Sequence, residues 1–418
     1  MKKNYSLVSL VLLTFFVISF LTNIIGPLIP EIIESFNLSL TLVSFLPFSF
    51  FIAYGIMSIP AGILTEKFGE KFLMLFAFVV SFIGALLFGL VPNYTMSIIS
   101  LFLIGTGMAM LQVVINPLLR TAGGEPNFYF FSILGQLFFG LASFLSPLVY
   151  SFMVINLKNN TDTYSWLKIF SSLVPSNLAW VSLYWVFALV AFLMIVIVFF
   201  FRFPKVELKE DEKAGTFQTH INLFKNKYVI LFFLGIFCYV GSEQGVANWM
   251  SKFLSLYHGY DPQTTGAQVI SFFWGMMTVG TFIGLFLVKI FNSRFILIFF
   301  TIGAILALSA ALFGSGIVAL YAFPAIGFFA AVMYPIIISL ALNSVQDHHG
   351  SFSGILITGI SGGAIVSLLI GLIGDQISLK FGMIFLYITL GYILSIGIWA
   401  RPLVDNKTIK ISDFFSRK

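Results

Sequence analysis

One acidic residue stands out because the sequence around it is apolar: Glu243 lies near the middle of the segment 228–256. If that segment crosses a membrane, an ionised carboxylate at this depth costs about 2.5 to 3.5 kcal/mol on insertion scales. Such a group usually pairs, binds a cation or takes up a proton. Glu243 is therefore the candidate for binding a coupling ion. The sequence leaves open the alternative of a glutamate at the outer membrane interface that hydrogen-bonds to a neighbouring helix.

Neutral amides provide a second kind of chemistry. Gln112 and Asn116 are four residues apart, so a helix places both on one face, and an amide both donates and accepts hydrogen bonds, as the binding of sugar hydroxyls requires. Hydrogen bonds between helices would use the same side chains, and the sequence does not decide between the two roles. An aromatic side chain such as Trp249 can stack on the apolar face of a sugar ring. We predict a substrate site formed by Asn23, Gln112, Asn116, Gln136, Gln244, Asn248, Trp249, Trp274 and Asn343.

The composition shows which elements must position these residues. Hydrophobic side chains make up 59% of the 418 residues and charged ones 9%, with a mean hydropathy of +1.03, whereas soluble proteins carry charges on roughly a quarter of their residues. A soluble, disordered or fibrous chain is therefore excluded. A membrane-spanning helix needs about 20 apolar residues, and we predict twelve such helices. Their approximate ranges are 6–29, 40–62, 72–91, 96–119, 128–152, 181–202, 228–256, 266–288, 295–313, 316–341, 352–374 and 382–400.

The distribution of basic residues predicts the orientation in the membrane. An even number of crossings places both termini on one side, and lysine and arginine accumulate on the cytoplasmic side of membrane proteins. Of the 22 lysines and arginines, only Lys158, Lys168, Lys252 and Lys380 fall on the side opposite the termini. We therefore predict cytoplasmic termini in a bacterial inner membrane. The net charge of +6 follows from this distribution and gives no support for nucleic acid binding.

Two short matches indicate that the chain consists of two similar halves. Tyr54-Gly55 resembles Trp274-Gly275 at an offset of 220 residues, and Asn116-Pro117 resembles Tyr334-Pro335 at an offset of 218. Transporters are often built from such repeats around a central site. The matches therefore predict two pseudo-symmetric bundles of six helices each.

The halves, residues 1–202 and 228–418, flank a charged stretch at 203–227 that we predict to be a solvated cytoplasmic linker. The offset of 220 places Asn23 of the first predicted helix opposite Glu243 of the seventh. Both residues have glycine or proline neighbours, and an interrupted backbone inside a membrane is tolerated where it lines a wet cavity. We therefore predict that the first helix of each half is broken at a central binding site.

The segment Gly62–Lys71 joins the second and third predicted helices and combines two glycines with acidic and basic residues. Glycine permits a tight reversal of the chain. The charged side chains can bridge helix ends across the two halves, so that their contacts form and break as the bundles rock. We predict a gating loop formed by Gly62, Glu66, Lys67, Gly69 and Lys71.

This loop resembles the signature loop of the major facilitator superfamily, and twelve helices in two halves agree with that family. Within it, the chain is similar to the fucose permease branch of sugar:cation symporters over nearly its whole length. The likeness is carried by Pro60–Leu64, Asn116-Pro117, Phe237–Gly241, and Tyr334-Pro335 with the later Gly362-Gly363. The resemblance implies an all-α membrane protein of the major facilitator fold, which exposes a central site to each side of the membrane in turn.

The resemblance also indicates a difference in coupling. Proton-coupled fucose permease has an aspartate in helix 1 and a glutamate in helix 4, and the matching positions here are Gly26 and Gln112. Neither residue can exchange a proton. Glu243 is then the only deeply placed acid that remains for coupling.

We predict a secondary active transporter that moves a small polar solute, a monosaccharide, by alternating access, with Glu243 binding a coupling proton or sodium ion. A facilitator-type exporter of a lipophilic drug or metabolite is the alternative, consistent with the 52 phenylalanines. A third class is a receptor, scaffold or membrane enzyme, but no nucleophile–base pair, metal-ligand cluster or phosphate-binding loop supports an enzyme. We expect no catalytic residue, no metal, no cofactor besides the coupling ion, and a chain that acts as a monomer.

Overall fold

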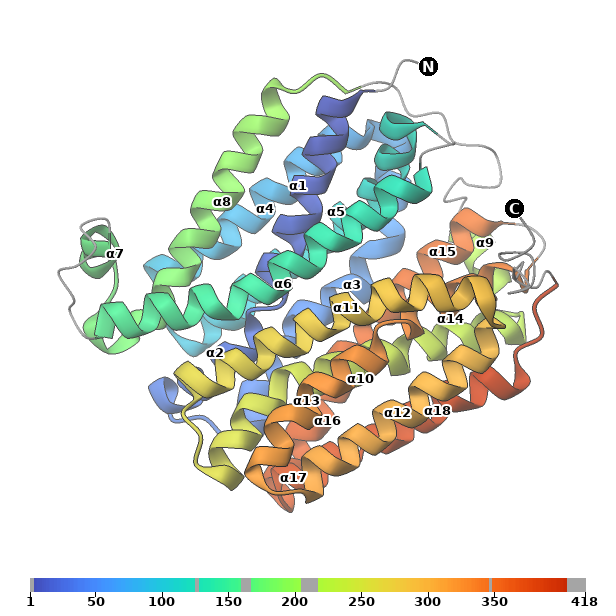
Figure 1. The fold of residues 1–418 in the computed structure, drawn as a ribbon. Helices are drawn as coiled ribbons and strands as arrows, with labels where there is room; N and C mark the ends of the chain where they lie inside the picture. Colours follow the sequence, from blue (N-terminus) through green and yellow to red (C-terminus); the bar gives the residue numbers. More distant parts are fainter. Residues whose placement is uncertain (1–3, 125–127, 159–166, 204–216, 346–347, 404–418) are drawn as a thin grey trace, which may run out of the picture.

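The computed structural model describes residues 4–124, 128–158, 167–203, 217–345 and 348–403. These residues form helices and contain no β-strand. Twelve helices among them are long and apolar enough to cross a membrane, and each overlaps one of the predicted crossings. They lie side by side in one bundle, with the start of α1 and the end of α18 at the same end (Figure 1). The prediction of an all-α protein with twelve membrane-spanning helices is therefore confirmed.

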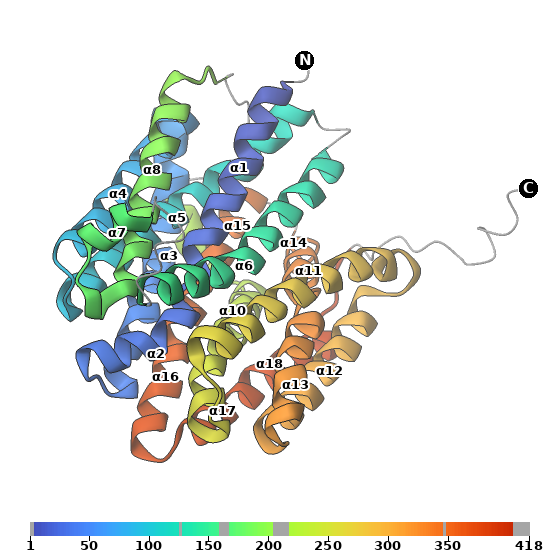
Figure 2. The ribbon, with the colours of Figure 1, turned by 60° about the vertical axis from the view of Figure 1, so that its left-hand side comes forward.

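The described helices divide into an N-terminal half, residues 4–203, and a C-terminal half, residues 217–403, which occupy separate sides of the molecule (Figure 2). The N-terminal half contains α1 (Tyr5–Thr22), α2 (Ile25–Phe36), α3 (Leu40–Phe68), α4 (Glu70–Leu90), α5 (Tyr94–Gly123), α6 (Phe128–Lys158), α7 (Leu167–Leu173) and α8 (Ser182–Phe200). The C-terminal half contains α9 (Phe217–Leu223), α10 (Lys227–His258), α11 (Ala267–Ile290), α12 (Ser293–Phe313), α13 (Gly316–Ala330), α14 (Met333–Leu342), α15 (His349–Thr358), α16 (Gly362–Gln376), α17 (Leu379–Ile384) and α18 (Leu386–Trp399).

Proline explains two of the interrupted crossings. A proline has no backbone N–H to donate to the carbonyl four residues earlier. Pro27 leaves the Asn23 carbonyl without its helical partner, and the first crossing is interrupted between α1 and α2 at that residue. Pro335 likewise leaves the Ala331 carbonyl without its helical partner, and the crossing is interrupted there between α13 and α14. The predicted break in the first helix is therefore confirmed.

The corresponding break predicted at Glu243 is wrong, because α10 is one continuous helix over 32 residues. The neighbouring glycines serve packing instead. A Cβ atom added at Gly245 would lie 2.8 Å from Leu386 and 3.0 Å from Ile370, and one added at Gly241 would meet Val366. Glycine here lets α10 approach α16 and α18 closely and does not interrupt the helix.

The contact between the halves uses the glycines that the repeat identifies. A Cβ atom at Gly55 of α3 would lie 3.1 Å from the Cβ atom of Ser361, and one at Gly275 of α11 would lie 3.0 Å from the Phe144 ring of α6. Each matched glycine thus faces the opposite half. The α3 contact with α15 and α16 and the α6 contact with α11 are therefore the two related seams of the interface.

The two ends of the interface differ. We call the end at which α1 begins and α18 ends the terminus side and the other end the far side (Figure 1). On the far side the halves are bonded together, because the Asp375 carboxylate of α16 accepts hydrogen bonds from the backbone N–H groups of Leu40 (2.9 Å) and Thr41 (2.7 Å) of α3.

A second far-side bond between the halves runs from the Gln263 side chain to the Glu31 carboxylate of α2. Glu31 also forms an ion pair with Lys158 of its own half at 3.1 Å. On the terminus side, by contrast, a groove of about 420 Å³ follows α3. It is lined by Gly55, Ile56, Ile59, Pro60, Ile63 and Leu64. The structure is therefore closed on the far side.

The stretch predicted as a solvated linker contains a packed element. Residues 204–216 lie outside the described part of the chain, but the following helix α9 contacts α15. His220 of α9 is buried, with only 2% of its surface exposed, and lies against Gly354. The prediction of a solvated linker is therefore wrong for α9. One face of this short helix packs against α15, and a count of charged residues does not detect that face.

The Asp375 cap predicts how the two states are balanced. Asp375→Ala removes two hydrogen bonds that exist only when the far side is closed, worth about 1 kcal/mol in total after solvent screening. We expect the population of the present state relative to the alternative to fall about fivefold. The rate at which a maleimide labels Asn116→Cys, in a chain with its single cysteine removed by Cys238→Ser, measures that population.

Asn93→Ala is the matched control for Asp375→Ala. Asn93 caps the start of α5 by accepting a hydrogen bond from the Met96 N–H at 2.9 Å, a bond that lies within the N-terminal half. We expect Asn93→Ala to lower thermal stability without changing the labelling rate. Equal labelling rates in both variants would show that Asp375 stabilises only the end of α3.

Candidate functional site

Three predicted amides lie in the middle or terminus-side parts of the N-terminal half. Gln112 and Asn116 lie on one face of α5 as predicted, with Gln112 half-buried and Asn116 exposed. Gln136 of α6 is also exposed and lies one turn before Gly140, which contacts Thr278 of the other half. Residues four apart share a helix face, so Gln136 also faces the interface. None of the three amides has a hydrogen-bond partner within the described residues.

A small polar cluster surrounds Asn23 at the end of α1. The Asn23 Nδ2 group donates to the Ser143 hydroxyl of α6 at 2.8 Å and to the Ser19 hydroxyl at 3.3 Å. The two hydroxyls are 2.6 Å apart. The Oδ1 atom of Asn23 is buried and has no partner among the described residues. It is therefore a hydrogen-bond acceptor available to a donor from outside the cluster.

Two of the three substrate residues predicted on α10, after Glu243, are packed against α16. Asn248 Nδ2 donates to the Ser367 hydroxyl at 3.2 Å, and Trp249 Nε1 donates to the Ser367 carbonyl at 3.3 Å. Both side chains are buried. Their hydrogen bonds join two helices of the same half, and a role in substrate binding stays a prediction for both.

Trp274 and Asn343 occupy very different places. Trp274 of α11 is buried, and its Nε1 has no partner among the described residues. The exposed side chains of α11 include Phe272, Val279 and Ile283, so the buried Trp274 lies on a different face of this helix. Asn343 ends α14 on the terminus side, where its carbonyl accepts from the Leu403 N–H at 2.7 Å. The structure therefore does not bring Asn343 together with Trp274.

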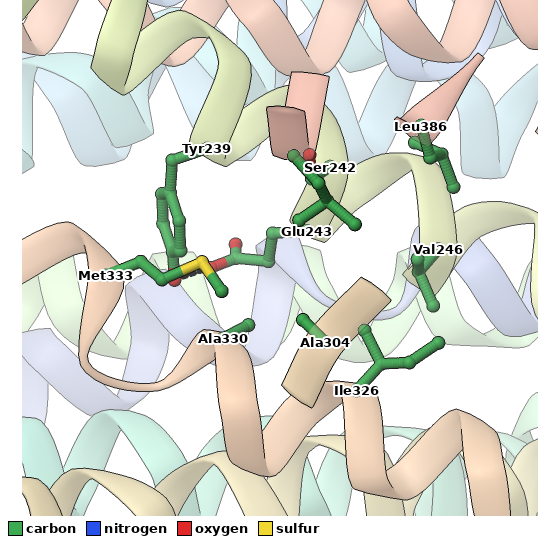
Figure 3. Close-up of a pocket in the computed structure, with 10 residues that line it drawn as sticks. Tyr239, Ser242, Glu243, Val246, Ala304, Ile326, Ala330, Met333 and Leu386 are labelled. Atoms are coloured by element: carbon green, nitrogen blue, oxygen red, sulfur yellow. Dashed lines mark hydrogen bonds between the residues drawn. The ribbon is translucent and has the colours of Figure 1, made fainter. Parts of the chain in front are cut away.

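Glu243 lies at the centre of α10, and its carboxylate is directed toward the interior of the C-terminal half (Figure 3). The Tyr239 hydroxyl, one turn earlier, donates to Oε2, and Gln244 Nε2 donates to Oε1 at 3.0 Å. A void of about 10 Å³ adjoins the carboxylate. Its other lining residues are Ser242, Val246, Ala304, Ile326, Ala330, Met333, Leu386 and Leu390. The predicted ion-binding acid is therefore separate from the amides of the N-terminal half.

The predicted gating loop is shorter than the sequence indicates. Gly62, Glu66 and Lys67 belong to α3, which continues to Phe68, and Gly69 alone reverses the chain with a φ of 84°. A φ in this region favours glycine. The helix continues through Gly62 because a glycine weakens a helix only slightly when its backbone is paired.

Lys71 does not bridge the halves in this structure. Its Nζ donates to the carbonyls of Phe199 and Phe201, both at 2.8 Å, at the end of α8 in its own half. Lys67 is exposed and lies over the Phe68 ring at 5.2 Å. Lys71 is therefore placed to fasten the end of α8 within the N-terminal half.

Some residues of these clusters do not appear in the sequence-based prediction. Ser19 and Ser143 hold Asn23, and Tyr239 holds Glu243. Ser19 lies four residues before Asn23, and Tyr239 lies four residues before Glu243. This spacing places each pair on one helix face, so it could have predicted the roles of Ser19 and Tyr239. Asp375 gives no such signal, because its partner is 335 positions away.

Comparison with known proteins identifies the family. The family model described as Major Facilitator Superfamily matches residues 11–368. The chain is 30% identical over 408 residues to a glucose/galactose transporter of Brucella abortus, an alignment that covers 95% of each protein. The chain belongs to the major facilitator superfamily. The family that the sequence resemblance implies is therefore confirmed.

Other members of the major facilitator superfamily give the same result. The chain is 24% identical over 382 residues to the L-fucose-proton symporter of Escherichia coli, covering 86% of this chain and 85% of the symporter. The crystal structure of that family member, FucP, in the outward conformation matches with a TM-score of 0.68 at 21% identity, over 94% of this chain and 98% of the other. The structural match supports the major facilitator fold.

The contacts of Lys71 predict a structural role in place of a gating role. Lys71→Ala leaves two carbonyls at the end of α8 without their cation, at a cost of about 1 kcal/mol. We expect a lower melting temperature, followed by tryptophan fluorescence in detergent, and an unchanged rate of Asn116→Cys labelling. Lys67→Ala is the control and should change neither quantity. A changed labelling rate with an unchanged melting temperature would restore the gating role of Lys71.

Proposed function

We propose that this protein is a secondary active transporter of a monosaccharide, with coupling to a proton or a sodium ion through Glu243. The observation that carries the proposal is the set of unpartnered amides, Gln112, Asn116 and Gln136, on α5 and α6 of the N-terminal half, in a structure whose two halves are bonded together on the far side. Amides on a protein surface inside a membrane are costly unless they meet water or a polar ligand. Sugar hydroxyls provide such partners.

The relatives support the choice of substrate class. The Brucella abortus relative is named a glucose/galactose transporter, and the more distant Escherichia coli relative is named an L-fucose-proton symporter. All three sugars are monosaccharides, which present several hydroxyls around an apolar ring face. Neither name supports the alternative of an exporter of lipophilic drugs or metabolites. The members of the family act as transporters, and we infer no enzymatic activity.

The geometry supports transport by alternating access. In this state a sugar would reach the three amides from the terminus side and would be stopped at the far side by the glycine contacts and by the Asp375 cap. Opening the far side requires the halves to separate at Asp375 and Gln263 and to approach each other along the groove of α3. Asn23 Oδ1 and Trp274 Nε1, which lack partners, are further candidates to bind the sugar.

We further propose that the terminus side faces the cytoplasm of a bacterium, with the chain in the inner membrane and acting as a monomer. The excess of lysine and arginine on the terminus side supports this orientation. The state described here is then inward-facing. Cysteine labelling from one side of sealed vesicles tests the orientation independently of transport.

Removal of the amides predicts a loss of sugar affinity. Asn116→Ala and Gln136→Ala each remove one or two hydrogen bonds to the sugar, worth about 1 to 1.5 kcal/mol each. We expect each variant to raise the dissociation constant for glucose or galactose about tenfold. Sugar-dependent thermal stabilisation of the purified protein measures the constant, because a ligand that binds only the folded state raises its stability.

Asn156→Ala provides the matched control. Asn156 is an amide on the same helix as Gln136, but it is half-buried near the far-side end of α6, where its Nδ2 donates to the Phe152 carbonyl at 2.8 Å. We expect unchanged sugar affinity in this variant. Stabilisation of the wild type by lipophilic cations with no response to any monosaccharide would contradict the proposed function.

A further inference from the structure

The void beside the Glu243 carboxylate is lined by one half alone. The residues that line its void come from α10, α12, α13, α14 and α18, all of the C-terminal half (Figure 3). The amides proposed to bind the sugar lie in the other half, on α5 and α6. Glu243 is therefore placed to exchange an ion without touching a sugar held by α5 and α6.

The surroundings of the carboxylate contain few oxygen atoms. Apart from Glu243 itself, Tyr239 and Ser242 are the only polar residues that line the void, and the Ser242 hydroxyl already shares a hydrogen bond of 2.7 Å with Thr389. The rest of the lining is hydrocarbon or thioether. The described residues contain no group of three or more metal-ligating His, Cys, Asp or Glu side chains.

These surroundings distinguish between the two candidate ions. A sodium ion, like other hard cations, needs a shell of several oxygen atoms, and calcium for comparison takes six to eight at about 2.3 to 2.6 Å. The void of about 10 Å³ has room for about one water molecule. A proton needs only one oxygen of the carboxylate, and its binding removes the charge that is costly at this depth.

Other titratable groups near the carboxylate are tyrosines. Tyr239 donates to it, and the Tyr334 ring of α14 lies 5.7 Å from the Tyr239 ring. The residues that line the void from α12, α13 and α18 carry no titratable group, and the α16 residues that pack on Gly241 and Gly245 are Val366, Ile370 and Gly362. A proton bound here is therefore bound by Glu243.

The next residue links this carboxylate to the interface between the halves. Gln244 donates to Glu243 Oε1, while its Cγ atom lies beside Gly363 of α16, which also faces Phe51 of α3. A Cβ atom placed on Gly363 of α16 would be 3.2 Å from Gln244 and 3.0 Å from the Phe51 ring of the N-terminal half. The Gln244 side chain therefore bonds to the acid through its amide and packs at the interface between the halves through its Cγ atom.

We infer that the coupling ion is a proton carried by Glu243, and that Gln244 transmits its binding to the interface between the halves. This inference rests on the proposed function. A hydronium ion gives its proton to the carboxylate, forming one O–H bond and leaving a water molecule. The hydrogen bond from Gln244 then has a neutral acceptor, and hydrogen bonds to charged acceptors are about twice as strong. Protonation therefore loosens Gln244 at the seam and changes the relative stability of the two states.

The test uses the full-length protein in proteoliposomes with labelled glucose, galactose and fucose. Two quantities are measured: accumulation driven by an imposed proton or sodium gradient, and exchange of sugar at equilibrium without a gradient. We expect accumulation with the proton gradient and no effect of sodium. Glu243→Gln should reduce accumulation at least tenfold and leave exchange within about twofold. Glu34→Gln, which makes the same change at an exposed acid of α2, should leave both unchanged.

Gln244→Ala tests the transmission step. Gln244 is a positioning residue, so we expect this variant to move sugar with fewer protons per sugar, measured with a pH-sensitive dye trapped in the vesicles. An unchanged ratio of protons to sugar would overturn the role of Gln244.

The outcomes separate this inference from the proposed function. No exchange of any of the three sugars by the wild type would contradict the proposed function itself. Exchange with sodium-driven accumulation, or proton-driven accumulation that survives in Glu243→Gln, would overturn the proton inference and leave the transporter function standing. If Glu243→Gln also loses exchange, sugar-dependent thermal stabilisation decides: binding that depends on pH in the wild type and not in the variant supports the inference, and equal pH dependence overturns it.

Discussion

Close approach of the two halves at glycine is the interaction on which this structure depends. Lipid gives two helices no hydrophobic reason to associate, so they hold together by packing that small residues permit. Gly26 lies against the Ala247 carbonyl, Gly140 against Thr278, and Gly55 against Ser361, each across the interface. Such a seam consists of many weak contacts and few ionic bonds. It can therefore be stable in one state and still separate at moderate cost, which a rocking transporter requires.

The polar groups follow a complementary rule, because most of their bonds stay within one half. Asn23 bonds to Ser19 and Ser143, Asn248 bonds to Ser367, and Ser242 bonds to Thr389. Each half can then move as a unit without breaking these bonds inside the membrane, where an unpaired polar group is costly. The polar bonds that cross the interface include those from Leu40, Thr41 and Gln263 at the far-side end of the bundle, and one from the Ser271 hydroxyl of α11 to the Phe144 carbonyl of α6.

The sequence predicts the fold well and the site only in part, for physical reasons. Hydrophobic length determines the twelve crossings, and the missing N–H of Pro27 determines the break after α1. The same reasoning fails at Glu243, because glycine in a helix serves either a break or a close contact, and only the neighbouring α16 and α18 decide which. It also fails for Lys71, whose partners at the end of α8 lie about 130 positions away. Pairings over such distances are set by tertiary packing, which no local pattern contains.

The separation of the acid from the amides has a consequence for coupling. Successive residues of a helix point about 100° apart, so Glu243 can face the interior of the C-terminal half while Gln244 is directed to the seam. An acid inside the sugar site would compete with the sugar for the same hydrogen-bond donors. An acid behind the seam avoids that competition, because it acts on the halves through one amide. The continuous helix α10 is what makes this arrangement possible, since a break at Glu243 would remove the fixed angle between the two side chains.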